Sequence, residues 1–113
     1  MRKTDKKTDN QLRKVLTEVC EVALKEIDGF QWLTHLVDYS NFPNSLKIVC
    51  VFDTNDDLTK FQSGDSKKEL TQLVQTKLNQ ISINLKKLSE HIAYDTEENC
   101  ERDHRGNWAK RLG

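Results

Sequence analysis

Residues 46–53, Leu-Lys-Ile-Val-Cys-Val-Phe-Asp, place the strongest constraint on the fold of this chain. Side chains alternate between the two faces of a β-strand, which puts Ile48 and Cys50 on one face and Val51 on the other. A strand that is apolar on both faces is typical of the centre of a small sheet. We therefore expect a central strand here, with Cys50 as a buried small hydrophobe rather than a reactive thiol.

The preceding segment supplies a partner for this strand. Residues 30–39, FQWLTHLVDY, are rich in aromatic and β-branched residues, and the intervening residues 40–45, SNFPNS, are typical of a turn. The two segments predict an antiparallel β-hairpin. His35 would face the same way as Leu33 and Val37, which favours a core position over a catalytic one.

Two amphipathic helices flank the hairpin. Thr8 and Gln11 form a T-x-x-Q capping box, which predicts that a helix begins there and continues to a stop at Gly29. A second capping box, Ser66 to Glu69, precedes leucine and valine residues at helical spacing as far as about residue 79. A short helical turn before Gly64 connects the hairpin to this second helix.

Two interpretations fit residues 81–96. Ile81, Ile83 and Leu85 alternate as in a strand, and 91–96 has the composition of another strand. The apolar residues also continue a heptad pattern that would extend the second helix to Ile92. We favour strands, because the β-branched and Asn residues of 81–84 are weaker helix formers.

These elements predict an α+β fold: helix, β-hairpin, helix, then one or two further strands, in a small antiparallel sheet with the helices on one face. The length of 113 residues fits a single domain, 1–113, and the termini 1–8 and 98–113 are expected to be flexible or peripheral.

Composition narrows the class of protein. The 18 basic and 18 acidic residues balance to a net charge of zero, so the total gives no reason to expect a polyanionic or membrane partner. Three widely spaced cysteines suggest reduced thiols rather than a disulfide framework. The charged first residues and the lack of a long apolar run predict a soluble cytoplasmic protein without a signal peptide or a membrane segment.

The C-terminal residues contain the side chains most suited to metal binding. Cys100 and His104 are spaced i, i+4, so that one helical turn would present both to an ion, with further ligands from the surrounding segment. The alternative is a solvated tail with surface ion pairs. The candidate ligands are His91, Asp95, Glu97, Glu98, Cys100, Asp103 and His104.

We expect no catalytic residue, cofactor or metal in this chain. A metal-dependent hydrolase that uses the His, Asp and Cys residues of the tail is kept as an alternative. Its chemically favoured version gathers His35, His91 and Asp95 on one face of the sheet, which requires a strand at 91–96.

Both ends of the chain carry basic residues that suit nucleic acid. Residues 1–14 contain six basic and two acidic residues, a net charge of +4, and the last residues place a tryptophan among basic side chains. The candidate nucleic-acid-binding residues are Arg2, Lys3, Lys6, Lys7, Arg105, Trp108, Lys110 and Arg111.

The segments FQWLTHLV, SLKIVCVFDT and YDTEEN together resemble a group of short bacterial proteins, including kinds carried on the mobile gene cassettes of integrons. Such proteins are sometimes named as Fis-type nucleoid regulators, which would imply a DNA-bending helix-turn-helix dimer. This chain departs from the regulator pattern: its middle is strand-forming, and its C-terminus lacks two short helices joined by a Gly-containing turn. No functional residue is carried over from the resemblance.

The leading functional hypothesis is a small cytoplasmic binding or regulatory protein without catalytic activity that forms a homodimer. Its basis is a small sheet in which Phe30, Trp32 and Phe52 offer more apolar surface than two helices cover. A different protein partner fits the same argument, and a nucleic-acid accessory protein that uses the basic termini is the second hypothesis.

Overall fold

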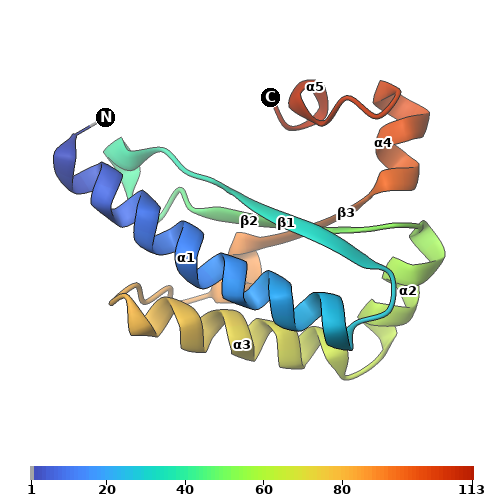
Figure 1. The fold of residues 1–113 in the computed structure, drawn as a ribbon, viewed down its shortest axis with the longest axis horizontal. Helices are drawn as coiled ribbons and strands as arrows, with labels where there is room; N and C mark the ends of the chain where they lie inside the picture. Colours follow the sequence, from blue (N-terminus) through green and yellow to red (C-terminus); the bar gives the residue numbers. More distant parts are fainter. Residues whose placement is uncertain (1) are drawn as a thin grey trace.

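A computed structural model describes residues 2–113 of the chain. Helices and strands alternate from the N-terminus to the C-terminus as drawn in Figure 1. The elements are α1 (Lys3–Glu26), β1 (Phe30–Leu36), the 3-10 helix η1 (Tyr39–Asn41), β2 (Lys47–Phe52), α2 (Asn55–Ser63), α3 (Ser66–Gln80), the 3-10 helix η2 (Leu88–His91), β3 (Ile92–Thr96), α4 (Glu97–His104) and α5 (Trp108–Leu112).

The three strands form one sheet in the order β1-β2-β3, with β2 in the centre. The α+β class, the hairpin of β1 and β2 and the central position of residues 47–52 are confirmed. The expectation of a wholly antiparallel sheet is wrong, because β3 runs parallel to β2. Helices α2 and α3 lie between these two strands in the chain and return it to the end where β2 began, which is the connection that a parallel pair requires.

Helices α1 and α3 lie side by side across one face of the sheet (Figure 1). Ile48, Cys50 and Phe52 of β2 point to this face, and each is 0% exposed. The helices contribute one apolar stripe each to the same core. These stripes include Leu12, Leu16 and Val19 of α1 and Leu70, Val74 and Leu78 of α3.

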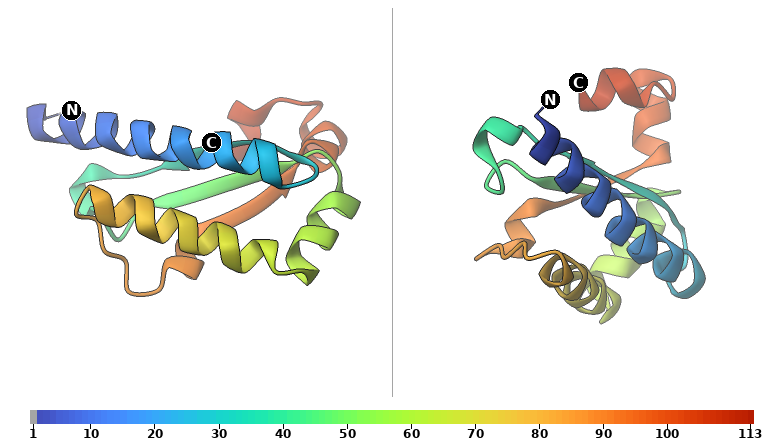
Figure 2. Two further views of the ribbon diagram at one scale, coloured as in Figure 1. Left: turned by 60° about the horizontal axis from the view of Figure 1, so that its bottom comes forward. Right: turned by 60° about the vertical axis from the view of Figure 1, so that its left-hand side comes forward.

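The opposite face of the sheet is covered by the C-terminal helices. Trp32 and Asp95 are the sheet neighbours of Val51, so all three side chains point to this face. The Trp108 ring of α5 packs edge-to-face on Trp32 with ring centroids 4.8 Å apart, and Arg111 pairs with Asp95. Figure 2 shows α3 and the α4–α5 pair on opposite sides of the strands. The prediction that the two amphipathic helices lie on one face is thus confirmed for α1 and α3, whereas α4 and α5, which the sequence did not predict, lie on the other.

The segment after α3 follows neither interpretation completely. The strand predicted at 91–96 is confirmed as β3, whereas residues 81–87 form neither a strand nor a continued helix. Ser82 has a left-handed φ of 62°, and the N–H groups of Ser82 and Ile83 donate to the carbonyls of Asn79 and Leu78. This is a Schellman motif, which ends a helix. The sequence gives no sign of it, because serine, not glycine, occupies the left-handed position.

The predicted capping boxes do not form. α1 begins at Lys3, and the Thr8 hydroxyl lies inside it and donates to the carbonyl of Thr4. α3 does begin at Ser66, but its N-cap residue, Asp65, makes no side-chain hydrogen bond. Residues 98–113, which we expected to be flexible or peripheral, are largely contained in α4 and α5.

Replacing Ser82 by glycine is expected to stabilise the protein by roughly 1 kcal/mol, because glycine adopts a positive φ without the steric strain of a Cβ atom. The measurement is the urea midpoint of unfolding, followed by circular dichroism. Ser89→Gly is the control, since Ser89 is exposed and has no positive φ, and this variant should lose stability. A lower midpoint for Ser82→Gly would contradict the assignment of the helix end.

Candidate functional site

A groove runs between α1 and β1, along the side of the sheet where β1 is the outermost strand. Its volume is about 700 Å³. Within residues 2–113, β2 is the only strand that pairs with β1, so the other edge of β1 has no sheet partner. The residues that line the groove include Leu16, Leu33 and Leu36, and a polar cluster closes one end.

Asp9 is the centre of that polar cluster. Its residue exposure is only 8%, and it accepts hydrogen bonds from three side chains. His35 Nε2 lies 3.0 Å from Asp9 Oδ1, Tyr39 Oη donates to the same oxygen at 2.7 Å, and Arg13 Nε donates to Oδ2 at 2.9 Å. The cluster therefore ties the first turns of α1 to the end of β1 and to η1.

The hydrogen bonds of the cluster shift two pKa values. The bond from His35, followed by that from Tyr39, lowers the pKa of Asp9 below its ordinary value of 3.8, although burial acts in the opposite direction. Burial and the bond to Asp9 raise the pKa of Tyr39 above 10.0. Asp9 is thus an ionised acceptor near neutral pH, and His35 carries a hydrogen on Nε2 to donate to it.

The sequence analysis singled out one residue of this polar cluster, His35. It placed His35 beside Leu33 and Val37, and all three line the groove. It missed Asp9 and Tyr39 as a connected pair with His35, because contacts across 26 and 30 residues of chain have no local signature. One signal was present: Asp9 lies three residues before Leu12 and seven before Leu16, on the apolar stripe of the helix.

Cys20 lines the same groove and is half-buried, while Cys50 is fully buried behind it in the core. Cys50 is buried in the core, as predicted, and burial raises the pKa of its thiol to about 12. Within residues 2–113, no cysteine, serine or threonine side chain hydrogen bonds to a histidine.

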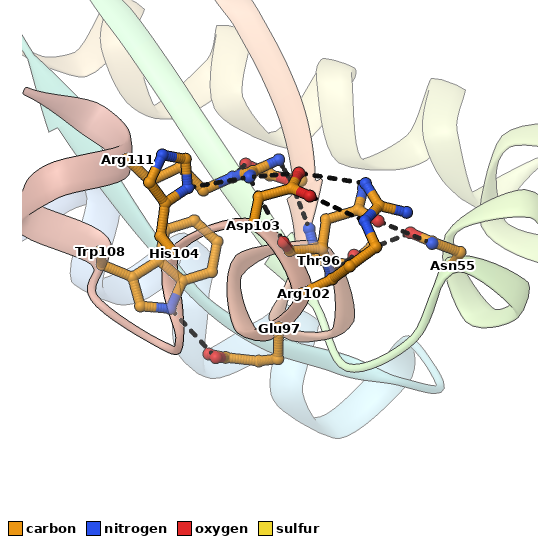
Figure 3. A network of polar contacts seen from close by, with 10 residues as sticks. Asn55, Thr96, Glu97, Arg102, Asp103, His104, Trp108 and Arg111 are labelled. Atoms are coloured by element: carbon orange, nitrogen blue, oxygen red, sulfur yellow. Dashed lines mark hydrogen bonds and ion pairs between the residues drawn. The ribbon is translucent and has the colours of Figure 1, made fainter.

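The residues of the tail form a second polar cluster, shown in Figure 3. Glu97 Oε1 accepts a hydrogen bond from Trp32 Nε1 at 2.6 Å, and its Oε2 accepts one from Trp108 Nε1 at 3.0 Å. Arg111 Nε donates to Asp95 Oδ2 at 2.6 Å, and Arg111 Nη1 donates to Asp103 at 3.1 Å. These contacts fasten α4 and α5 to the sheet.

A small group of hydrogen-bonded polar side chains joins the carboxyl ends of β2 and β3. Each strand is followed by a helix whose N-cap is a threonine, Thr54 before α2 and Thr96 before α4. The Thr96 hydroxyl donates to Asn55 Oδ1 at 2.8 Å, and Asn55 Nδ2 donates to Asn99 Oδ1 at 2.8 Å. Both helix starts are thus satisfied by side chains of the chain itself.

The metal ligands suggested by the sequence do not converge. His91 Nδ1 contacts the carbonyl of Leu46, Cys100 is fully buried, and His104 Nδ1 accepts from Arg111. No group of three or more His, Cys, Asp or Glu side chains in the described part of the chain could hold a metal ion. The arrangement of His35, His91 and Asp95 on one sheet face is wrong, because His35 pairs with Ile48 and Asp95 with Val51, on opposite faces.

The basic candidate residues fall into two groups. Trp108 and Arg111 are half-buried and occupied by Glu97, Asp95 and Asp103, as described above. The remaining candidates are all exposed to solvent. No hydrogen bond within residues 2–113 joins the N-terminal candidates to the C-terminal ones. They are Arg2, Lys3, Lys6 and Lys7 at the start of the chain and Arg105 and Lys110 near its end.

Comparisons of the chain with protein-family models, with curated proteins and with solved structures found no match. No helix within residues 2–113 has both the length and the apolar character needed to span a bilayer.

Asp9→Asn is expected to lower the free energy of unfolding by about 1–3 kcal/mol at about pH 7, because His35, Tyr39 and Arg13 lose an ionised acceptor. The folded-state pKa of Asp9 lies below its unfolded value of 3.8, so its contribution is complete above that value and is lost as the pH falls through the folded pKa. Urea unfolding at neutral and acidic pH measures the difference.

Asp65→Asn is the matched control, since Asp65 is exposed and makes no side-chain cap bond. It should change the free energy of unfolding by less than about 0.5 kcal/mol. A difference between Asp9→Asn and the unsubstituted protein that stays constant from neutral to strongly acidic pH would contradict the ionised cluster.

Proposed function

We propose that this chain is a small cytoplasmic binding or regulatory protein without catalytic activity, which forms a homodimer through the free edge of β1 and the groove beside it. The uncovered aromatic surface expected from Phe30, Trp32 and Phe52 is absent, because Phe30 and Phe52 are buried and Trp32 packs against Trp108. The observation that carries the proposal is instead the position of Leu36. It is 37% exposed, lies at the end of the free edge and lines the groove. Leu36 and Leu24 are the two large hydrophobic residues that are exposed within residues 2–113, and Leu24, in α1, is 54% exposed.

The composition of β1 supports pairing at its edge. Edge strands that stay unpaired usually carry lysine, proline or an inward-pointing charge that discourages another strand. Phe30–Leu36, FQWLTHL, contains no lysine and no proline, and its only ionisable side chain, His35, is held by Asp9. An irregularity in register between Phe30 and Trp32 affects only the start of the strand. Residues 33–36 thus offer a regular edge to another strand.

The charges of α1 favour a second copy of the chain as the partner. Arg13 and Glu21 each lie four residues from Thr17 on the helix face that borders the groove. Two copies related by a two-fold axis near Thr17 would set Arg13 of one against Glu21 of the other, twice. The Arg13 side chain is 72% exposed although it contacts Asp9, so it remains accessible to such a partner.

The reduced state of the thiols supports the cytoplasmic location. All three cysteines are free, and two of them are buried where no second cysteine bonds to them. We do not propose a metal-dependent hydrolase, because the candidate ligands His91 and His104 make hydrogen bonds with different partners.

Leu36→Lys is expected to convert the dimer to a monomer, because a lysine at the edge introduces a charge that must be desolvated on strand pairing. Multi-angle light scattering across a concentration series measures the mass. Gln72→Lys, an equal charge change on the exposed face of α3, is the control and should leave the dimer intact. A monomer mass for the unsubstituted protein at every concentration would refute self-association.

Glu21→Lys tests the symmetry. It is expected to weaken the dimer at low ionic strength, because the introduced ammonium group would face Arg13 of the other copy, and to do so less at high salt, where exposed charges are screened. Sedimentation at two salt concentrations compares the dissociation constants. A Glu21→Lys dimer as tight as the unsubstituted one at low salt would exclude the two-fold axis near Thr17.

A further inference from the structure

The first turns of α1 form a basic surface that the self-association described above does not use. They extend past the sheet and past α3 at one end of the molecule (Figure 2, left). A shallow surface hollow of about 430 Å³ lies along them. It is lined by Lys3, Lys6, Lys7, Asn10, Gln11 and Lys14.

None of the lysines of this surface takes part in an ion pair in the described part of the chain. Among residues 2–113, the ion pairs involve Arg13, His35, Lys60, Lys77, Arg102 and Arg111, and none of the four lysines of the hollow. Asp9, one of the two acidic residues in this stretch, is buried and already accepts from Arg13, His35 and Tyr39. Its charge is therefore directed into the fold, and none of the residues that line the hollow is acidic.

This placement is electrostatically unfavourable for the isolated protein. Lys3 and Lys7 are spaced i, i+4, as neighbouring like charges on one helix face. Lys3 also lies in the first turn of α1, where the helix dipole disfavours cations. A partner with several negative charges would reduce both unfavourable effects.

The geometry favours a regular polyanion. Lys3, Lys7 and Lys14 follow one side of the helix at i, i+4 and i+11, a length of about 16 Å at the helical rise. The rod-like first turns are narrow enough to approach a duplex groove. The exposed amides of Asn10 and Gln11 lie between the lysines and supply donors and acceptors for phosphates and base edges.

Two observations disfavour a lipid surface as the partner. A helix that lies on a membrane presents large apolar side chains beside its lysines. In α1, Leu12, Val15 and Leu16 are all buried in the protein core, and the hollow contains no apolar lining residue.

We propose that Lys3, Lys6, Lys7 and Lys14, with Asn10 and Gln11, bind the phosphate backbone of duplex nucleic acid. The surface differs from the one that the sequence suggested: Trp108 and Arg111 are excluded because their side chains hold α5 on the sheet. Binding is dominated by phosphate contacts and releases condensed counterions.

The test is fluorescence anisotropy of labelled duplex DNA and duplex RNA with the full chain, at low and raised salt. Replacing Lys3, Lys7 and Lys14 by Gln together should weaken binding at least tenfold at low salt. The slope of log K against log salt should fall by about 2.7, since each phosphate contact contributes about 0.9. The two duplexes distinguish a DNA ligand from an RNA ligand.

The matched control replaces Lys68, Lys86 and Lys87 by Gln, which removes the same charge from exposed positions far from the hollow in the sequence. It should leave affinity and salt slope unchanged. Light scattering of both triple variants checks that the oligomeric state is the same, and Leu36→Lys should retain the phosphate contacts of each chain.

Three results would overturn the proposal: no binding of either duplex at low salt, an equal loss in the control variant, or equally tight binding of polyglutamate. The last would assign the surface to an acidic protein. None of these results bears on the dimer, which is measured without nucleic acid.

Discussion

Strand β2 is buried on both faces, and the positions of the other elements follow from the need to cover it. Ile48, Cys50 and Phe52 face α1 and α3, while Val49 and Val51, 2% and 0% exposed, point away from them. A chain of 113 residues has few elements with which to cover two faces. The short helices α4 and α5 therefore become part of the folded structure, fixed over Val51 by the contact of Trp108 with Trp32 and by the ion pair of Arg111 with Asp95.

The edge of β1 that faces away from β2 has no strand partner within residues 2–113. α1 serves two purposes: it covers the core face with Leu12, Leu16 and Val19, and it reaches β1 through Asp9. Asp9 holds His35 and Tyr39 at one end of the groove, and the remaining length of α1 and β1 borders it. The proposed dimer and the proposed nucleic-acid surface use different parts of this helix, the dimer its middle and the nucleic-acid surface its first turns.

Polar side chains in this protein mainly connect separate elements of the fold through hydrogen bonds. Glu97 joins the two tryptophans, Asn55 joins the starts of α2 and α4, and Asp9 joins α1 to the hairpin. None of the buried side-chain nitrogen or oxygen atoms of residues 2–113 lacks a hydrogen-bond partner. The exposed lysines at the start of α1 take no part in these contacts. We therefore propose that they bind an external partner.

The sequence by itself determined the local structure that periodicity and turn chemistry encode: the two long amphipathic helices, the hairpin, the central strand at residues 47–52 and the burial of Cys50. Only the tertiary structure decided that β3 runs parallel to β2, that α4 and α5 cover the second sheet face, and that Asp9, His35 and Tyr39 meet. The physical reason is the distance along the chain between the residues that determine each feature. Helix and strand patterns repeat within a few residues, whereas strand direction and the partners of Asp9 and Arg111 depend on which distant segments pack together.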